Sequence, residues 1–297
     1  MGLVYLVLSA LAGALFGQTY KRKVGLGFDT AQVLLWFSVS SSVLLFTTFA
    51  ATGFSGISRS ALWMPFAHGI AMAIAMHTYY AAIETSRLGI SWTAIQLSVV
   101  IPFFTSVVVY GETLGPYGAA GIVSILGAIA LYGFGRGGEN GDVSSIDRRT
   151  RRRALTALLI ASITTGITSA LLRTFAHHHP EPEAVPLFFL LVSLTLLAIN
   201  LPICFRRCAR RGTPVYDVAV VRFSAYKSVV NMSAMAFLLL TVQLLPGFFV
   251  FPVRNTLNIL MVFALSAVFH HERISKLEAI AVALAIAGIA LLSYAME

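Results

Sequence analysis

The stretch GETLGPYGAAGIVSILGAIAL at residues 111–131 has a counterpart 160 residues later, HERISKLEAIAVALAIAGIAL at residues 271–291. In each copy a glutamate, Glu112 or Glu272, precedes an apolar run of small residues that ends in Ile-Ala-Leu. Each run is close to the length that crosses a bilayer as a helix. A match at one fixed offset, near the end of each half of the chain, predicts an internal repeat.

Similar apolar segments fill most of the 297 residues. Hydrophobic residues make up 58% of the chain and charged residues only 11%, with a mean hydropathy of +0.83. A soluble domain of this length does not need so much apolar surface. We therefore expect an all-α integral membrane protein with ten transmembrane helices. The apolar segments place these helices at 2–20, 30–52, 62–84, 89–110, 115–135, 153–175, 184–204, 217–241, 247–270 and 276–295.

A polar and charged stretch separates the fifth segment from the sixth. It predicts a first five-helix repeat at 1–135, a charged cytoplasmic linker at 136–152 and a second five-helix repeat at 153–297. Because five is an odd number, the second repeat enters the membrane from the opposite face. The expected fold is thus two inverted five-helix repeats.

The Lys and Arg residues between the segments are distributed unequally between the two faces. One face has only Arg59 and Arg173. The other has Lys21, Arg22, Lys23, Arg87, Arg136, Arg148, Arg149, Arg151, Arg152, Arg153, Arg206, Arg207, Arg210, Arg211, Arg273 and Lys276. Basic loops stay in the cytoplasm, which predicts a multi-pass protein of the plasma or inner membrane with both termini outside.

The arrangement resembles the drug/metabolite transporter superfamily and its EamA-type ten-helix members. The residues that carry the likeness are Pro102 to Glu112, then Gly118, Gly121 and Gly127, and the matching run from His271 to Gly288. The resemblance covers nearly the whole chain. It implies an alternating-access carrier of a small polar metabolite, bound between the halves. Many ten-helix relatives have cytoplasmic termini, whereas the charge distribution here predicts the reverse.

Charged and amide side chains inside two predicted helices are the candidate substrate site. Lys227 and Asn231 are four residues apart, as are Arg254 and Asn258, so each pair shares one helical face. An ionisable group at mid-membrane costs about 2.5–3.5 kcal/mol on insertion scales. We expect a cationic chamber that binds an anionic or zwitterionic substrate, with Arg222 as a further candidate contact.

The alternative is that these cations pair with internal carboxylates and hold helices together. The only carboxylate expected near membrane depth is Glu84, and Asp217 is expected at the interface before the eighth helix. If they fill this role, the protein is a non-transporting receptor or scaffold.

A polar stripe on the third predicted helix is a second set of candidates. His77, Tyr80 and Glu84 share one face, and Gln96 follows on the next helix. We expect His77, Tyr80 and Gln96 to contact substrate, and His77 and Glu84 to be candidates for proton coupling. A packing role is the alternative for His77.

Other functional classes find less support in the sequence. The arginines of residues 148–153 border a predicted helix, which favours anionic lipid at the cytoplasmic face over nucleic acid. No nucleophile and base are paired at membrane depth, so we expect no enzyme activity, no catalytic residues, no cofactor and no metal site. The expected partners are a small-molecule substrate and the lipid bilayer, for a monomer or homodimer.

Overall fold

The computed structural model describes residues 1–52, 62–83, 95–113, 115–137, 148–179, 184–270 and 276–295. All regular structure in these ranges is helical. The long elements are α1 (Gly2–Leu26), α2 (Thr30–Thr52), α3 (Trp63–Ile83), α6 (Pro116–Gly137), α7 (Arg148–His178), α8 (Ala184–Arg211), α9 (Val218–Leu244), α10 (Gly247–His270) and α11 (Lys276–Tyr294). Between α3 and α6 lie η2 (Leu97–Val99), α5 (Val100–Phe104) and the π-helical turn η3 (Thr105–Val109).

The expectation of an all-α protein is confirmed, and most helices lie where the apolar segments predict them. The segment predicted at 89–110 changes from 3-10 to α to π geometry around Pro102, whose ring removes a backbone donor. Helix α7 begins at Arg148 and α8 continues to Arg211. The end of the predicted linker is therefore helical, because arginine is a good helix former and extends both helices.

Within the described part of the chain, five helices are long and apolar enough to cross a membrane. They span Gly2–Leu26, Thr30–Thr48, Arg152–His178, Ala184–Arg211 and Val218–Leu244. Large apolar side chains are exposed on their surfaces, among them Phe46, Leu159 and Val229. Exposed apolar surface on several long helices is compatible with a multi-pass membrane protein.

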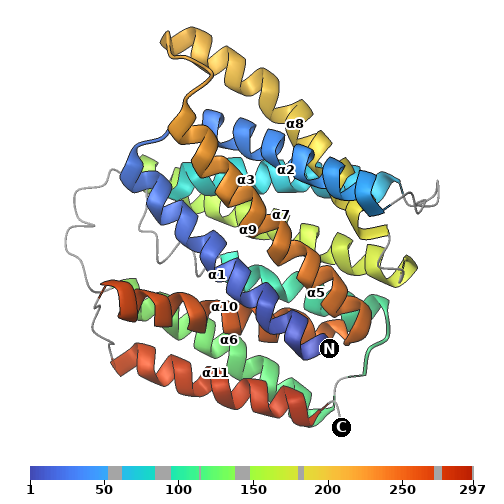
Figure 1. The fold of residues 1–297 in the computed structure, drawn as a ribbon. Helices are drawn as coiled ribbons and strands as arrows, with labels where there is room; N and C mark the ends of the chain where they lie inside the picture. The colour runs from blue at the N-terminus through green and yellow to red at the C-terminus, as the bar shows by residue number, and fades with distance from the viewer. Residues whose placement is uncertain are drawn as a thin grey trace.

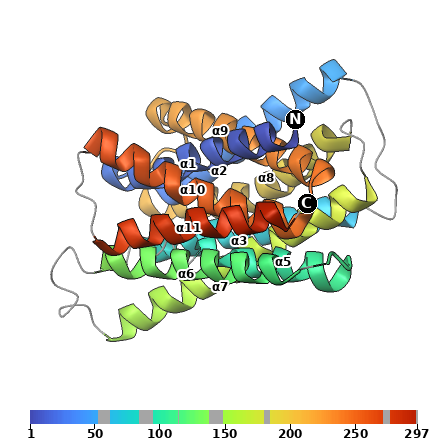
Figure 2. The ribbon, with the colours of Figure 1, turned by 90° about the horizontal axis from the view of Figure 1, so that it is seen from below.

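The helices run back and forth along one bundle, and both termini lie at the same end of it (Figures 1 and 2). We call this the terminal end. The opposite end is where α1 ends and α7 begins, and we call it the basic end. Its described basic residues are Arg22, Lys23, Arg152, Arg153, Arg206, Arg207, Arg210 and Arg211.

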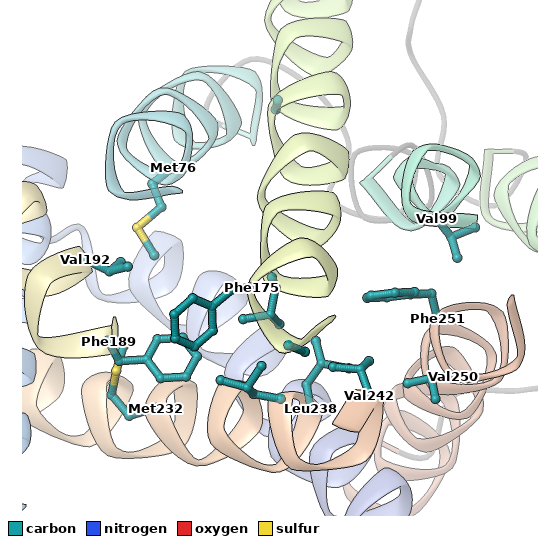
Figure 3. Packing of buried hydrophobic residues seen from close by; sticks show 14 of the residues in the cluster. Met76, Val99, Phe175, Phe189, Val192, Met232, Leu238, Val242, Val250 and Phe251 are labelled. Atoms are coloured by element: carbon teal, nitrogen blue, oxygen red, sulfur yellow. The ribbon is translucent and has the colours of Figure 1, made fainter. Parts of the chain in front are cut away.

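Buried side chains from helices far apart in sequence form one continuous core. In Figure 3, Phe175 of α7, Phe189 of α8 and Leu238 of α9 pack together, and Val250 and Phe251 of α10 extend the cluster. The core joins elements from both ends of the chain, so the two predicted repeats form one packed body.

Helices α6 and α11 lie side by side (Figure 1) and pack closely where two glycines meet. A methyl group on Gly288 would lie 2.9 Å from the carbonyl oxygen of Gly121 and 2.7 Å from Cγ1 of Ile125. Small residues allow this approach, as in helix pairs packed within membranes.

We predict that Gly288→Ala lowers the free energy of unfolding by about 1–3 kcal/mol, because the added methyl must push the two backbones apart. Gly25→Ala is the matched control, since nothing lies within 4 Å of the position its methyl would occupy. Denaturant unfolding in detergent compares the two variants. Equal stability of both would contradict close α6–α11 packing.

Candidate functional site

A cavity of about 140 Å³ lies in the middle of the bundle. Its walls come from α1, α3, the residues before η2, α7, α9 and α10. The polar lining residues are Tyr20, His68, Tyr79, Gln96, Thr165, Thr168, Asn231, Arg254 and Asn258. Four of the predicted substrate contacts, Gln96, Asn231, Arg254 and Asn258, thus surround one space.

Arg254 is the cationic group of the cavity. Its Nε donates to Ser9 Oγ at 2.8 Å, and Ser9 Oγ donates in turn to the carbonyl oxygen of Ala234 at 2.8 Å. This chain ties α10 to α1 and α9 and fixes the guanidinium at the wall. No carboxylate of the described residues forms an ion pair with Arg254. The guanidinium can therefore present its remaining N–H donors to an anion.

Several other polar atoms around the cavity are buried and have no hydrogen-bond partner among the residues that the structure describes. They are Nδ1 of His68, Nε2 of Gln96, both amide atoms of Asn231 and Oδ1 of Asn258. A buried polar group without a partner is costly, and such groups in a folded protein usually meet water or a ligand. The site thus offers one fixed cation together with unused donors and acceptors.

Lys227 lies outside this cavity, although the sequence predicts it as a substrate contact. Its side chain is fully buried, and Nζ donates to Tyr80 Oη. The ammonium also lies 4.1 Å from the ring centroid of Tyr20, 5.1 Å from that of Phe16 and 5.6 Å from that of Phe37. Aromatic faces attract cations, most strongly where water is excluded. These rings from α1 and α2, with Tyr80 of α3, solvate the lysine and hold α9 against three helices.

The remaining candidates are not gathered at the cavity either. His77 Nε2 lies 2.8 Å from Asn200 Oδ1 on the α8 side of α3, so it takes the packing role that was its alternative. Arg222 is exposed on α9. Asp217, considered as an internal counter-ion, caps α9 by accepting from the Ala219 amide at 2.8 Å. Glu84 lies outside the described residues.

The cavity lies against a different face of α3 from the one that the sequence prediction singled out. His68 and Tyr79 line the cavity, whereas His77 does not. At 100° per residue, the nine positions from His68 to His77 amount to about two and a half turns, which puts the two histidines on opposite faces. The prediction followed the more polar stripe of α3. The face that lines the cavity instead carries a histidine among methionines and small residues.

A second polar cluster closes the terminal end. Glu112 pairs with Arg173 of α7 and accepts from the Gly247 amide at 3.0 Å and the Phe248 amide at 2.8 Å. Arg173 Nη1 also donates to the carbonyl oxygen of Val242 at 2.9 Å. A carboxylate is favoured at the N-terminus of α10, where backbone N–H groups are unpaired. We call this cluster the Glu112 latch.

Within the described ranges, no three His, Cys, Asp or Glu side chains come together so that they could hold a metal ion. Cys204 and Cys208 are free and buried inside α8, with their sulfur atoms 3.8 Å apart. The groups that the cavity offers to a ligand are one guanidinium, three amides and aromatic rings.

Comparisons with known proteins bear on the fold alone. No protein-family model matches this chain, and no curated protein matches it in sequence. Among solved structures, 29 chains match. One, described only as the crystal structure of a protein, has a TM-score of 0.66 and 17% sequence identity, and the match covers 96% of this chain and 98% of that one. The whole length of this chain is thus similar in fold to a solved structure.

We predict that Glu112→Gln lowers the free energy of unfolding by about 1–3 kcal/mol, because it leaves Arg173 without its counter-charge. Arg207→Gln is the control. The Arg207 side chain is 38% exposed, and in the variant its partner Asp29 still pairs with Arg211, at 2.8 Å. Loss of Arg207 should therefore lower the free energy of unfolding by less than about 1 kcal/mol. Denaturant titration in detergent measures both. A smaller effect at Glu112 than at Arg207 would mean that the latch does not hold the terminal end.

We also predict that Tyr80→Phe destabilises the protein by about 1.5–3 kcal/mol, since it removes the hydroxyl that accepts from Lys227. The double variant Tyr80→Phe/Lys227→Met should regain part of the lost stability, because it no longer contains the buried ammonium group that needs the Tyr80 hydroxyl as its acceptor. Tyr117→Phe, at an exposed tyrosine, should leave stability unchanged. Additive effects of Tyr80→Phe and Lys227→Met in this double-mutant cycle would argue against a structural role for the lysine.

Proposed function

We propose that the chain is an integral membrane protein whose ten helices form two inverted five-helix repeats, 1–135 and 153–297. The pairwise contacts support this. If α1, α2, α3, α5 and α6 are exchanged with α7, α8, α9, α10 and α11, each major contact has a counterpart. Thus α1–α9 corresponds to α7–α3, α2–α9 to α8–α3, and α1–α10 to α7–α5, while α2–α8 and α6–α11 map onto themselves.

The proposed orientation places the basic end in the cytoplasm and the terminal end outside, in a plasma or inner membrane. The described arginines and lysines of the loops and helix ends support it, because they collect at the basic end, whereas Arg173 is held in the Glu112 latch. Positive charges near the ends of spanning helices are retained on the cytoplasmic side.

Within this fold, we propose a secondary transporter that moves a small anionic or zwitterionic metabolite by alternating access. The observation that carries the proposal is the unpaired Arg254 in a central cavity. The cavity walls come from α1, α3 and Gln96 in the first repeat and from their counterparts α7, α9 and α10 in the second. Transporters with inverted repeats bind substrate at such an interface near mid-membrane.

The size and lining of the cavity restrict the substrate. An apolar cavity of about 150 Å³ holds a molecule as large as benzene, so 140 Å³ suits a compact metabolite. Arg254 favours a carboxylate or another planar anion. Acceptors such as Asn258 Oδ1 suit an amine or hydroxyl on the same molecule, and Phe16 and Met72 suit its apolar part.

The Glu112 latch supports alternating access. Glu112 belongs to the first repeat, and its partners Arg173, Gly247 and Phe248 belong to the second. The latch therefore joins the two halves near the terminal end. In a transport cycle the two halves rock about the substrate, so the latch must open once per cycle. These features agree with the resemblance to the drug/metabolite transporter superfamily.

The alternative is a receptor or scaffold in which the buried cations have structural roles. The aromatic surroundings of Lys227 favour such a role for Lys227 alone. Lys227 is fully solvated by rings and by Tyr80, so it has no need of a substrate. Arg254 lacks such a set of partners, and this difference favours transport.

We predict that benzoate or phenylglycine raises the melting temperature of the detergent-purified protein, because ligands that bind only the folded state stabilise it. Benzylamine, of matched size, should have no effect. The response should disappear in Arg254→Gln and persist in Arg222→Gln, which removes an exposed arginine. An unchanged response in Arg254→Gln, or a response to benzylamine alone, would contradict the anion site.

Uptake of the stabilising ligand into proteoliposomes then separates transporter from receptor. Uptake lost in Arg254→Gln supports transport. Binding without uptake in the intact protein would favour the receptor.

A further inference from the structure

A second hollow lies on the outside of the bundle, separate from the central cavity. It has a volume of about 490 Å³ and runs between α3 and α7 near the basic end. Its lining residues are His77, Thr78, Ala81, Arg152, Arg153, Thr156, Ala157 and Ile160. We call it the α3–α7 groove.

Two arginines make the described lining of the groove positively charged. Arg152 and Arg153 are both exposed at its basic end, and the described residues that line the groove include no acid. No carboxylate within the described ranges forms an ion pair with either arginine. Of the other polar groups, His77 bonds Asn200, Thr78 bonds the carbonyl oxygen of Ile74, and Thr156 bonds that of Arg152. The free hydrogen-bonding capacity is thus that of two guanidinium groups, which suit a phosphate.

From the groove toward the terminal end, exposed apolar side chains continue along both helices, and Ile160 is the one of them that lines the groove. Exposed side chains follow α7 at Leu159, Ile160, Ile163 and Ile167, and α3 carries Ile70 and Ile74 on its surface. From Arg153 to Ile163 the helix rises about 15 Å at 1.5 Å per residue, which equals one leaflet of a hydrocarbon core about 30 Å thick. A cationic head site followed by an apolar track one leaflet long matches a phospholipid.

We propose that the α3–α7 groove binds one anionic phospholipid of the cytoplasmic leaflet. Its phosphate lies between Arg152 and Arg153, and an acyl chain lies along Ile160 and Ile163. This inference rests on the proposed membrane location but is independent of transport. Anionic headgroups concentrate basic segments at the cytoplasmic surface, and the groove adds a defined contact for the chain. A soluble phosphate ester shares the headgroup chemistry but cannot fill the apolar track.

The test uses the full chain in detergent with phosphatidylglycerol and with phosphatidylcholine of identical acyl chains. Native mass spectrometry counts the lipid bound, and the melting temperature follows the effect on stability. We expect phosphatidylglycerol to bind at least tenfold more tightly than phosphatidylcholine, and glycerol 1-phosphate not to displace it. Arg152→Gln/Arg153→Gln should abolish the preference.

Arg206→Gln/Arg210→Gln is the matched control, because it removes two exposed arginines from α8 at the same end. It should keep the preference. Equal loss of the lipid preference in both double variants would overturn the proposed lipid site in favour of general surface charge. Equal binding of the two lipids by the intact protein would also overturn it. Displacement by glycerol 1-phosphate would show a free phosphate site instead. The benzoate response at Arg254 serves as an independent check of folding and of the proposed transport site.

Discussion

Two cationic side chains, Lys227 and Arg254, lie inside the bundle with no carboxylate of the described residues beside them. A buried charge must be solvated by something other than water, and the two sites meet this requirement differently. Lys227 draws the rings of Phe16, Tyr20 and Phe37 and the hydroxyl of Tyr80 around itself, so α1, α2 and α3 converge on α9. Arg254 has one bond, to Ser9. The rings around Lys227 complete the core, whereas Arg254 keeps unused hydrogen-bond donors that face the cavity.

The Glu112 latch connects this unused capacity to the shape of the molecule. A single carboxylate from the first half holds an arginine and the first amides of α10 from the second. The same helix carries Arg254 a little less than two turns further on. A rotation of α10 that frees Glu112 therefore also moves the guanidinium in the cavity. One helix thus carries both the amide partners of Glu112 and the guanidinium of the proposed anion site.

The sequence predicted the helices far better than the site, and the reason is physical. Apolar length and the polar or charged breaks between apolar segments indicate where most helices lie, and they do so without tertiary information. Which face of a helix points inward depends on its neighbours. The inward faces of these helices carry both polar and apolar residues, so hydrophobic periodicity does not identify them. The prediction therefore chose His77 and not His68. Arg254 and Asn258 were found because a cation and an amide one turn apart are rare in an apolar helix. The ring faces around Lys227 could not be predicted, since they come from three other helices.

Helices α3 and α7 pack against each other and take part in both the cavity and the α3–α7 groove. His68 and Thr168 face the cavity, whereas Ala81 and Thr156 line the groove nearer the basic end. Any motion that separates these two helices changes both spaces together. A lipid shifts such an equilibrium only by its difference in affinity between the two states. Because the groove is formed by one helix from each half, the rocking that we propose for the halves would alter its width. An anionic lipid in the groove would therefore favour the state in which the basic ends of α3 and α7 are spaced to fit it.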